Sequence, residues 1–329
     1  MNIAEIYQEL MTSPAASGVM ERRAAPACPL SLFLFVEKPA NRLGFRVQFA
    51  SALLSEGAPL PQFRGLEFSR SRQSGQAVLI LRPTGEAYKD VFVVLVDDIV
   101  THASGQTSEA EAAAALLDRL GRWQTFLQNL RPEGLAPEEQ RGLYGELWFL
   151  RHRLLPHIPA DDAVHAWTGT ARTVKDFQFP GGAVEMKTTT ASTDPHLQIN
   201  GARQLDDEGL NRLFLAYLAL EPVQGSGETL PMMVSEVRAL MHGSLTAGKR
   251  LEDKLREAGY LDVHAPRYEQ PGYLQRESQV FQVAAGFPRL TERDLPAGVG
   301  DLHYRVSVAE CRHHLAADVD LMALIQGQV

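Results

Sequence analysis

Apolar and polar residues alternate with a period of two over several short segments in the first hundred residues. Glycine, proline and serine separate these segments, which cover 32–36, 45–49, 65–68, 77–81 and 91–96. A period of two, bounded by turn-forming residues, predicts β-strands. With a short helix over 1–12 before them, we expect a mostly antiparallel β module over residues 1–105.

Beyond residue 105 the apolar positions are spaced for helices and for longer, buried strands. Ser108 is a good N-cap with Glu111 at the capping-box position, which predicts a helix to about Leu130. The pattern predicts further helices at 137–155, 230–241 and 246–258, strands at 196–200, 212–220, 278–283 and 303–308, and a helical turn at 201–206. Residues 106–329 are therefore expected to form an α/β domain.

Two short alternations in the segment 175–187 meet at a Gly-Gly pair, which is typical of a tight β-hairpin turn. With that pair as a two-residue loop, Gln178 lies opposite Glu185 and Asp176 opposite Lys187. Because side chains alternate across a strand, these four project from one face. The apolar residues between them project from the other face, into a core.

Two carboxylates and an ammonium on one face of a half-buried hairpin make a divalent-metal site plausible. Like charges about 4 Å apart repel by roughly 4 kcal/mol at an effective dielectric of 20. A metal ion, the ammonium of Lys187, or a raised carboxyl pKa would each neutralise them. The alternative is a solvated strand face with a weak ion pair, worth about 0–1 kcal/mol.

Glu146 lies in the expected helix at 137–155, near the edge of its apolar stripe. An edge position suits a ligand that a helix contributes to a metal site. The alternative is an ordinary surface glutamate, and the sequence leaves both interpretations open.

An aspartate followed by Glu-x-Lys on the next strand resembles the signature of the PD-(D/E)xK nucleases, although Lys175 stands where the motif has proline. Further segments follow in order: GLYGELWFL, AWTGT, KDF, VEMKTTT, INGARQL, AGFPRL and LHYRVSVAEC. Together they resemble a bacterial family of unknown function classed with the PD-(D/E)xK proteins, often encoded beside restriction–modification or phage-defence genes. The resemblance covers roughly residues 110–315 well and the first hundred only weakly.

The resemblance implies a restriction-endonuclease-like α/β/α core and a Mg²⁺ cofactor, for which Mn²⁺ can substitute. It assigns Asp176 and Glu185 as metal ligands, with the carbonyl of Met186 as a third. Glu146 would complete the coordination shell or bind a second ion. Lys187 would orient the attacking water and stabilise the developing charge.

The function expected from this resemblance is a Mg²⁺-dependent DNA endonuclease acting in restriction or phage defence. Gln204, Thr188 and Gln178 are the candidate substrate-binding residues. The main alternative is a non-catalytic subunit with a nuclease fold, which binds DNA or helps to assemble a defence complex. A structure-selective repair nuclease is a third possibility. Expected partners are DNA, other defence-system proteins and a second copy of the chain in a homodimer.

Composition limits the other classes. The 329 residues are 45% hydrophobic, enough for a sizeable core, and the net charge of −8 argues against coating DNA by bulk electrostatics. No apolar run of about 18 residues and no signal-peptide pattern occurs, so we expect a cytoplasmic protein without membrane spans. Cys28 and Cys311, outside any motif, are expected to be buried in a reducing compartment.

Overall fold

The computed structural model describes residues 2–54, 62–171 and 174–327, and the chain divides into two compact units, Met1–Gly134 and Leu135–Val329. The division falls after Gly134, not at the expected residue 105. Helix α3 (Glu109–Asn129) belongs to the first unit because it packs against α2 (Lys89–Ser104). A buried ion pair between Asp98 and Arg119 joins these two helices.

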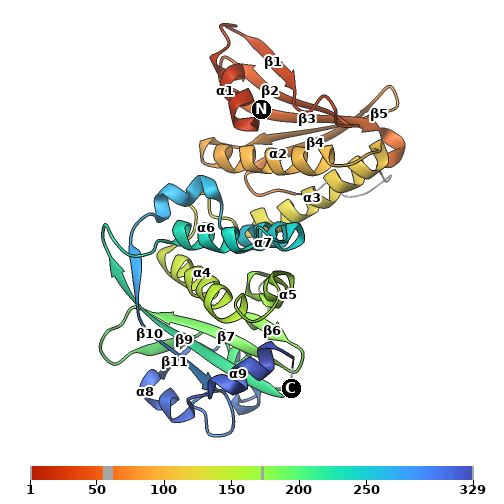
Figure 1. The fold of residues 1–329 in the computed structure, drawn as a ribbon. Helices are drawn as coiled ribbons and strands as arrows, with labels where there is room; N and C mark the ends of the chain where they lie inside the picture. Colours follow the sequence, from red (N-terminus) through yellow and green to blue (C-terminus); the bar gives the residue numbers. More distant parts are fainter. Residues whose placement is uncertain (1, 55–61, 172–173, 328–329) are drawn as a thin grey trace. The chain divides into compact units, whose positions relative to one another are not determined.

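The first unit holds an antiparallel five-stranded sheet in the order β1-β2-β3-β5-β4 (Figure 1). Its elements are α1 (Ile3–Thr12), β1 (Gly18–Arg23), β2 (Ser31–Lys38), β3 (Arg42–Ala50), β4 (Leu66–Gln73) and β5 (Gln76–Pro83), followed by α2 and α3. The first helix and the strands at 32–36, 45–49, 65–68 and 77–81 are confirmed. So is the Ser108 cap with its capping box. Strand β1 was not predicted, because nearly all of its residues are exposed.

The strand predicted at 91–96 is wrong, because this segment lies inside helix α2. Its buried residues include Val91, Leu95 and Ile99, which follow one another at intervals of four. That spacing places them on one face of a helix, against the core of the first unit. The short window 91–96 contained too few turns to separate a buried helix from a buried strand.

The second unit is built on a mixed four-stranded sheet in the order β10-β9-β7-β6. The strands are β6 (Phe177–Phe179), β7 (Gly182–Thr189), β9 (Arg212–Val223) and β10 (Gly272–Gln282). Strands β7 and β9 run parallel, and the outer pairs are antiparallel. The buried strand predicted at 212–220 is confirmed as the centre of this sheet, and the strand predicted at 278–283 as part of β10.

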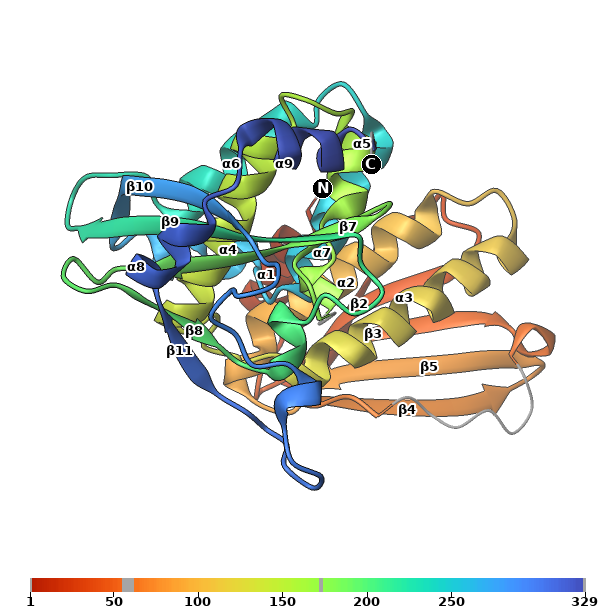
Figure 2. The ribbon, with the colours of Figure 1, turned by 90° about the horizontal axis from the view of Figure 1, so that it is seen from below.

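Two apolar clusters cover the two faces of this sheet. The first cluster contains residues of α4 (Pro137–Phe149), α5 (Ala160–Ala166), α6 (Leu230–Leu240), α7 (Leu245–Glu257) and α9 (Asp318–Ile325). The second contains residues of β8 (His196–Ile199), β11 (Tyr304–Ser307), α8 (Val308–Cys311) and the 3₁₀ turn η5 (Ala202–Leu205). Strands β8 and β11 pair antiparallel beside one another (Figure 2). The unit is thus an α/β core with helices on one face and a small sheet with short helical turns on the other.

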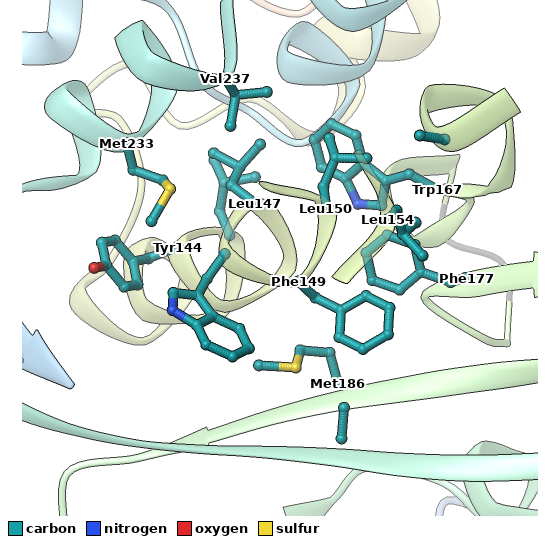
Figure 3. Close-up of a cluster of buried hydrophobic side chains, with 14 of the residues drawn as sticks. Tyr144, Leu147, Phe149, Leu150, Leu154, Trp167, Phe177, Met186, Met233 and Val237 are labelled. Carbon is teal, nitrogen blue, oxygen red and sulfur yellow. The ribbon is translucent and has the colours of Figure 1, made fainter. Parts of the chain in front are cut away.

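Helix α4 lies close against β7, and this contact brings the helix to the central sheet (Figure 3). A Cβ atom on Gly145 would come within 2.4 Å of the methyl group of Thr188, so only glycine fits there. The rings of Phe149 and Phe177 also meet, with centroids 4.8 Å apart. After Phe149 the helix continues as a π-helical turn, Leu150–Leu154, so the helix predicted at 137–155 is confirmed with a change of winding.

Cys28 and Cys311 are both buried and free, as expected. In the part of the chain that the structure describes, no helix combines the length and the apolar character needed to cross a membrane.

Candidate active site

The β6–β7 hairpin forms as predicted, but its register differs by two residues. Phe179 pairs with Gly182, so Pro180 and Gly181 are the turn residues. Gly181 has φ +89°, and a proline followed by a glycine in this conformation is typical of a type II turn. Gly182 instead belongs to β7, where a Cβ atom would lie 2.3 Å from the carbonyl oxygen of Arg212 on β9.

This register places Gln178 opposite Ala183, and the expected pairs of Gln178 with Glu185 and of Asp176 with Lys187 are wrong. Continued by one residue, it brings Asp176 beside Glu185. Because a shift of two residues preserves the side-chain alternation, the face assignment still holds. The acidic residues and Lys187 therefore remain on the common face that the sequence predicted.

Glu185 is fully buried on β7, and Lys187 lies two residues further along the same face. Lys187 Nζ is 2.7 Å from Glu185 Oε1, which makes an ion pair. Within the described residues, neither carboxylate oxygen of Glu185 accepts a hydrogen bond in good geometry. The alternative of a solvated strand face is excluded, because the exposed fraction of Glu185 is 0%.

Asp176 lies one residue before β6, and both its side chain and its main-chain carbonyl accept hydrogen bonds from backbone N–H groups. Its side-chain Oδ2 accepts a hydrogen bond from the Met186 backbone N–H at 2.7 Å. Its backbone carbonyl accepts hydrogen bonds from the N–H groups of Thr168 and Gly169, at 2.7 and 2.9 Å. The N–H and C=O of one strand residue point to the same side of the strand. The carbonyl of Met186 is therefore also directed toward the edge where Asp176 lies.

Glu146 reaches this place from helix α4. The indole Nε1–H of Trp167 donates a hydrogen bond to Glu146 Oε2 at 2.6 Å. A Cβ atom on Gly169 would lie 2.7 Å from Asp176 Oδ1 and 3.1 Å from Glu146 Oε2, so glycine leaves room for both carboxylates. Glu146 is therefore part of the acidic cluster and not an ordinary surface glutamate.

Burial, and after it the charge of the neighbouring Asp176, raise the pKa of Glu146 and of Glu185 to about 8 each. Burial also raises the pKa of Asp176, although Lys187 and the Met186 N–H oppose this shift. Burial acts to lower the pKa of Lys187, but Glu185 and Asp176 outweigh it and raise that pKa. Three carboxyl groups thus gather around the Lys187 ammonium, with the Lys175 ammonium also near Asp176 and Glu185, and the raised carboxyl pKa values show that the cluster favours additional positive charge.

A divalent cation fits the chemistry of this cluster. Mg²⁺ prefers oxygen ligands and commonly uses one or two carboxylates together with water and substrate oxygens. Glu185 offers two buried oxygens that accept no hydrogen bond in good geometry within the described residues, and Asp176 lies beside it. Across residues 2–54, 62–171 and 174–327, no three acidic, histidine or cysteine side chains already form a complete metal cage. A bound ion would therefore depend on further oxygens, such as the Met186 carbonyl or water.

Within the described residues, no hydrogen bond joins the side chains of the three predicted substrate-binding residues to the acidic cluster. Gln178 is exposed on β6. The methyl group of Thr188 faces Gly145 of α4, on the opposite face of β7 from Lys187. The side-chain oxygen of Gln204 accepts a hydrogen bond from the backbone N–H of Asn200. Their roles in substrate binding stay predictions.

Two residues that contact the cluster were not assigned a role from the sequence. Trp167 lies in the segment AWTGT, which was part of the family resemblance. Only this segment marked Trp167 in the sequence, and nothing there indicated its hydrogen bond to Glu146. Lys175 was noted only as a replacement for the motif's proline. It is buried, and burial lowers its pKa to about 8, although Glu185 opposes the shift.

The fold and the cluster together are those of the PD-(D/E)XK class, a mixed α/β core with two acids and a lysine on adjoining strands. A comparison with protein-family models matches residues 3–309 to the family described as "Putative PD-(D/E)XK family member, (DUF4420)". The chain belongs to this family. The match includes the first unit, beyond the 110–315 range of the sequence resemblance. No curated protein and no solved structure matches the chain.

Proposed function

We propose that the chain is a Mg²⁺-dependent DNA endonuclease that acts in restriction or phage defence. The observation that carries this proposal is the buried Glu185. Within the described residues its carboxylate oxygens accept no hydrogen bond in good geometry, and its one ion pair, to Lys187, is shared with the neighbouring acids Asp176 and Glu146. Burying a carboxylate in this state costs stability, so the arrangement is best explained by a ligand that compensates for it.

Asp176 and Glu185 would hold the cation, with the Met186 carbonyl as a third ligand and Glu146 completing the shell. When bound, the cation supplies Lewis-acid polarisation of the scissile phosphate. Asp176 is preorganised for ligation, because the Met186 N–H and the backbone of Thr168 fix its side chain and its main chain.

Lys187 is the group that would act on the attacking water. Its ammonium is mostly buried, with 15% of the side chain exposed, and it stays charged because its pKa is raised. A fixed positive charge in a low-dielectric place stabilises the negative charge that develops on the phosphate during hydrolysis. The same ammonium donates hydrogen bonds, so it would also orient the water.

The second candidate is a non-catalytic subunit that binds DNA without cutting it. Lys187 separates the two functions, because a charge that acts only in the transition state affects the rate and not the affinity. We expect Lys187→Ala to bind DNA in Ca²⁺ like the wild type. In Mg²⁺ its cleavage of plasmid DNA should be slower by about 10²–10³-fold.

The control is Lys89→Ala, which removes a lysine of the first unit that pairs with Glu86. This variant should cut and bind like the wild type. Full cleavage by Lys187→Ala would contradict the proposed mechanism. An equal loss of binding and cleavage in Lys187→Ala would favour the binding subunit.

A further inference from the structure

Lys175, which directly precedes Asp176, is clamped by three backbone carbonyl groups. Its ammonium donates hydrogen bonds to the carbonyls of Arg203, Gln204 and Asp206, at 2.6, 2.7 and 2.8 Å. An ammonium has three N–H donors, so these contacts employ all of them. The exposed fraction of Lys175 is only 6%.

Two of the three carbonyls belong to the 3₁₀ turn η5 and the third to its C-cap residue, Asp206, all far from Lys175 in the sequence. The Lys175 side chain therefore links the segment just before β6, which carries Asp176, to a turn about 30 residues later. A buried ammonium is costly unless it is fully hydrogen-bonded, and an apolar side chain in its place would leave the three carbonyl groups without these N–H donors. The Lys175 side chain therefore has a definite role here, because its ammonium holds the 202–206 turn through three hydrogen bonds.

Asp176 is held from three directions. Thr168 and Gly169 bind its carbonyl, the Met186 N–H binds its carboxylate, and Lys175 fixes the residue before it. Residues that orient a metal ligand without touching the metal contribute strongly to metal affinity.

We propose that Lys175 is a positioning residue, which locks the 202–206 turn onto the Asp176 strand and thereby sets Asp176 for metal ligation. The inference rests on the proposed function, since it assumes that Asp176 binds a cation. It assigns Lys175 no contact with substrate or metal. In this role, the lysine side chain links the segment that carries Asp176 to a distant turn. The proline that the motif has at this position cannot form such a link.

A role through charge alone predicts the opposite effect on metal binding. Lys175 is a cation near Glu185, so it repels a second cation at that carboxylate. If charge were its whole effect, removing the ammonium would strengthen metal binding. If it positions Asp176, removing it weakens metal binding. The sign of the change therefore distinguishes the two roles.

The experiment is a Mn²⁺ titration of the full chain by calorimetry, together with hydrogen exchange of residues 200–207 without metal. We expect Lys175→Met to weaken Mn²⁺ binding by about 10–100-fold. Exchange in 200–207 should become faster, because the turn loses its three N–H donors. Lys175→Gln keeps two N–H donors in a neutral group, so it should show the same changes to a smaller extent. Circular dichroism shows whether each variant folds. If Lys175→Met does not fold, Lys175→Gln still tests the inference.

The matched control is Lys249→Met, which removes an exposed lysine of the same unit and should change neither measurement. Mn²⁺ binding by a folded Lys175 variant as tight as in the wild type, or tighter, overturns this inference alone. A wild-type chain that takes up no Mn²⁺ overturns the proposed function, and this inference with it.

Discussion

Each unit of the protein buries a carboxylate, and the two carboxylates differ in how fully they are hydrogen-bonded. In the first unit, Asp98 receives two hydrogen bonds from Arg119, both at 2.7 Å, and one from the indole of Trp123 at 2.8 Å. In the second unit, Glu185 is more deeply buried and has one ion pair, to Lys187. Two further carboxyl groups also approach Glu185 in the second unit.

The difference separates a structural ion pair from a site prepared for a ligand. A buried charge that is fully paired and hydrogen-bonded fixes the packing of the elements that carry it. A buried carboxylate that shares its one cation with other acids lowers stability, and a folded chain retains it only if something else compensates for that loss. The Asp98 cluster therefore explains the packing of α2 on α3, and the Glu185 cluster carries the proposed function.

The largest expected effect is on the Asp98 cluster. Asp98→Ala leaves the buried guanidinium of Arg119 without its carboxylate, and breaking a buried pair in this way costs about 3–5 kcal/mol. Hydrogen exchange of peptides from α2 and α3 should show this loss of local stability. Asp118→Ala is the control, because Asp118 is mostly exposed and pairs only weakly with Arg122. If the two variants were equally stable, the structural role of Asp98 would be wrong.

The Glu185 cluster should respond to pH in the metal-free protein. The pKa values of Glu146 and Glu185 are about 8, whereas an unfolded glutamate has a pKa of about 4.3. Between these values the folded state binds more protons than the unfolded state, so stability falls as pH rises. We expect the stability of the second unit to fall as the pH rises from 5.5 to 8. Pulse proteolysis in urea, read on peptides from 177–189, measures this change.

The window ends at pH 8 because the lowered pKa of Lys175 acts with the opposite sign above it. The matched variants are Glu185→Gln, which should flatten the pH dependence, and Glu138→Gln, which changes an exposed residue of α4 and should leave it unchanged. Stability that rises over this window would mean that the folded state does not favour the protonated forms of Glu146 and Glu185.

The sequence predicted the parts of the site that depend on side-chain alternation. Glu185 and Lys187 share a face because a strand has a period of two, and this holds whatever the register. The register itself was wrong, because Gly182 is needed for the close approach of β9 and Pro180-Gly181 forms the turn instead. That approach is a long-range contact, which the local pattern does not contain.

The contacts that complete the site come from distant segments. Trp167 reaches Glu146 across 21 residues, and Lys175 reaches the 202–206 turn across about 30. Local periodicity carries no information on such pairs. The same limit explains α2, where a six-residue apolar window was interpreted as a strand although a longer one has helical spacing.

The central claim is that the buried carboxylates of the second unit form a divalent-metal site. The most direct measurement is Mn²⁺ binding by the full chain at pH 7.5, followed by the electron paramagnetic resonance signal of free Mn²⁺. The account predicts that the wild type and Glu138→Gln take up Mn²⁺ alike. Glu185→Gln and Glu146→Gln should bind it at least about tenfold more weakly. No uptake by the wild type, or equal uptake by Glu185→Gln, would contradict the claim.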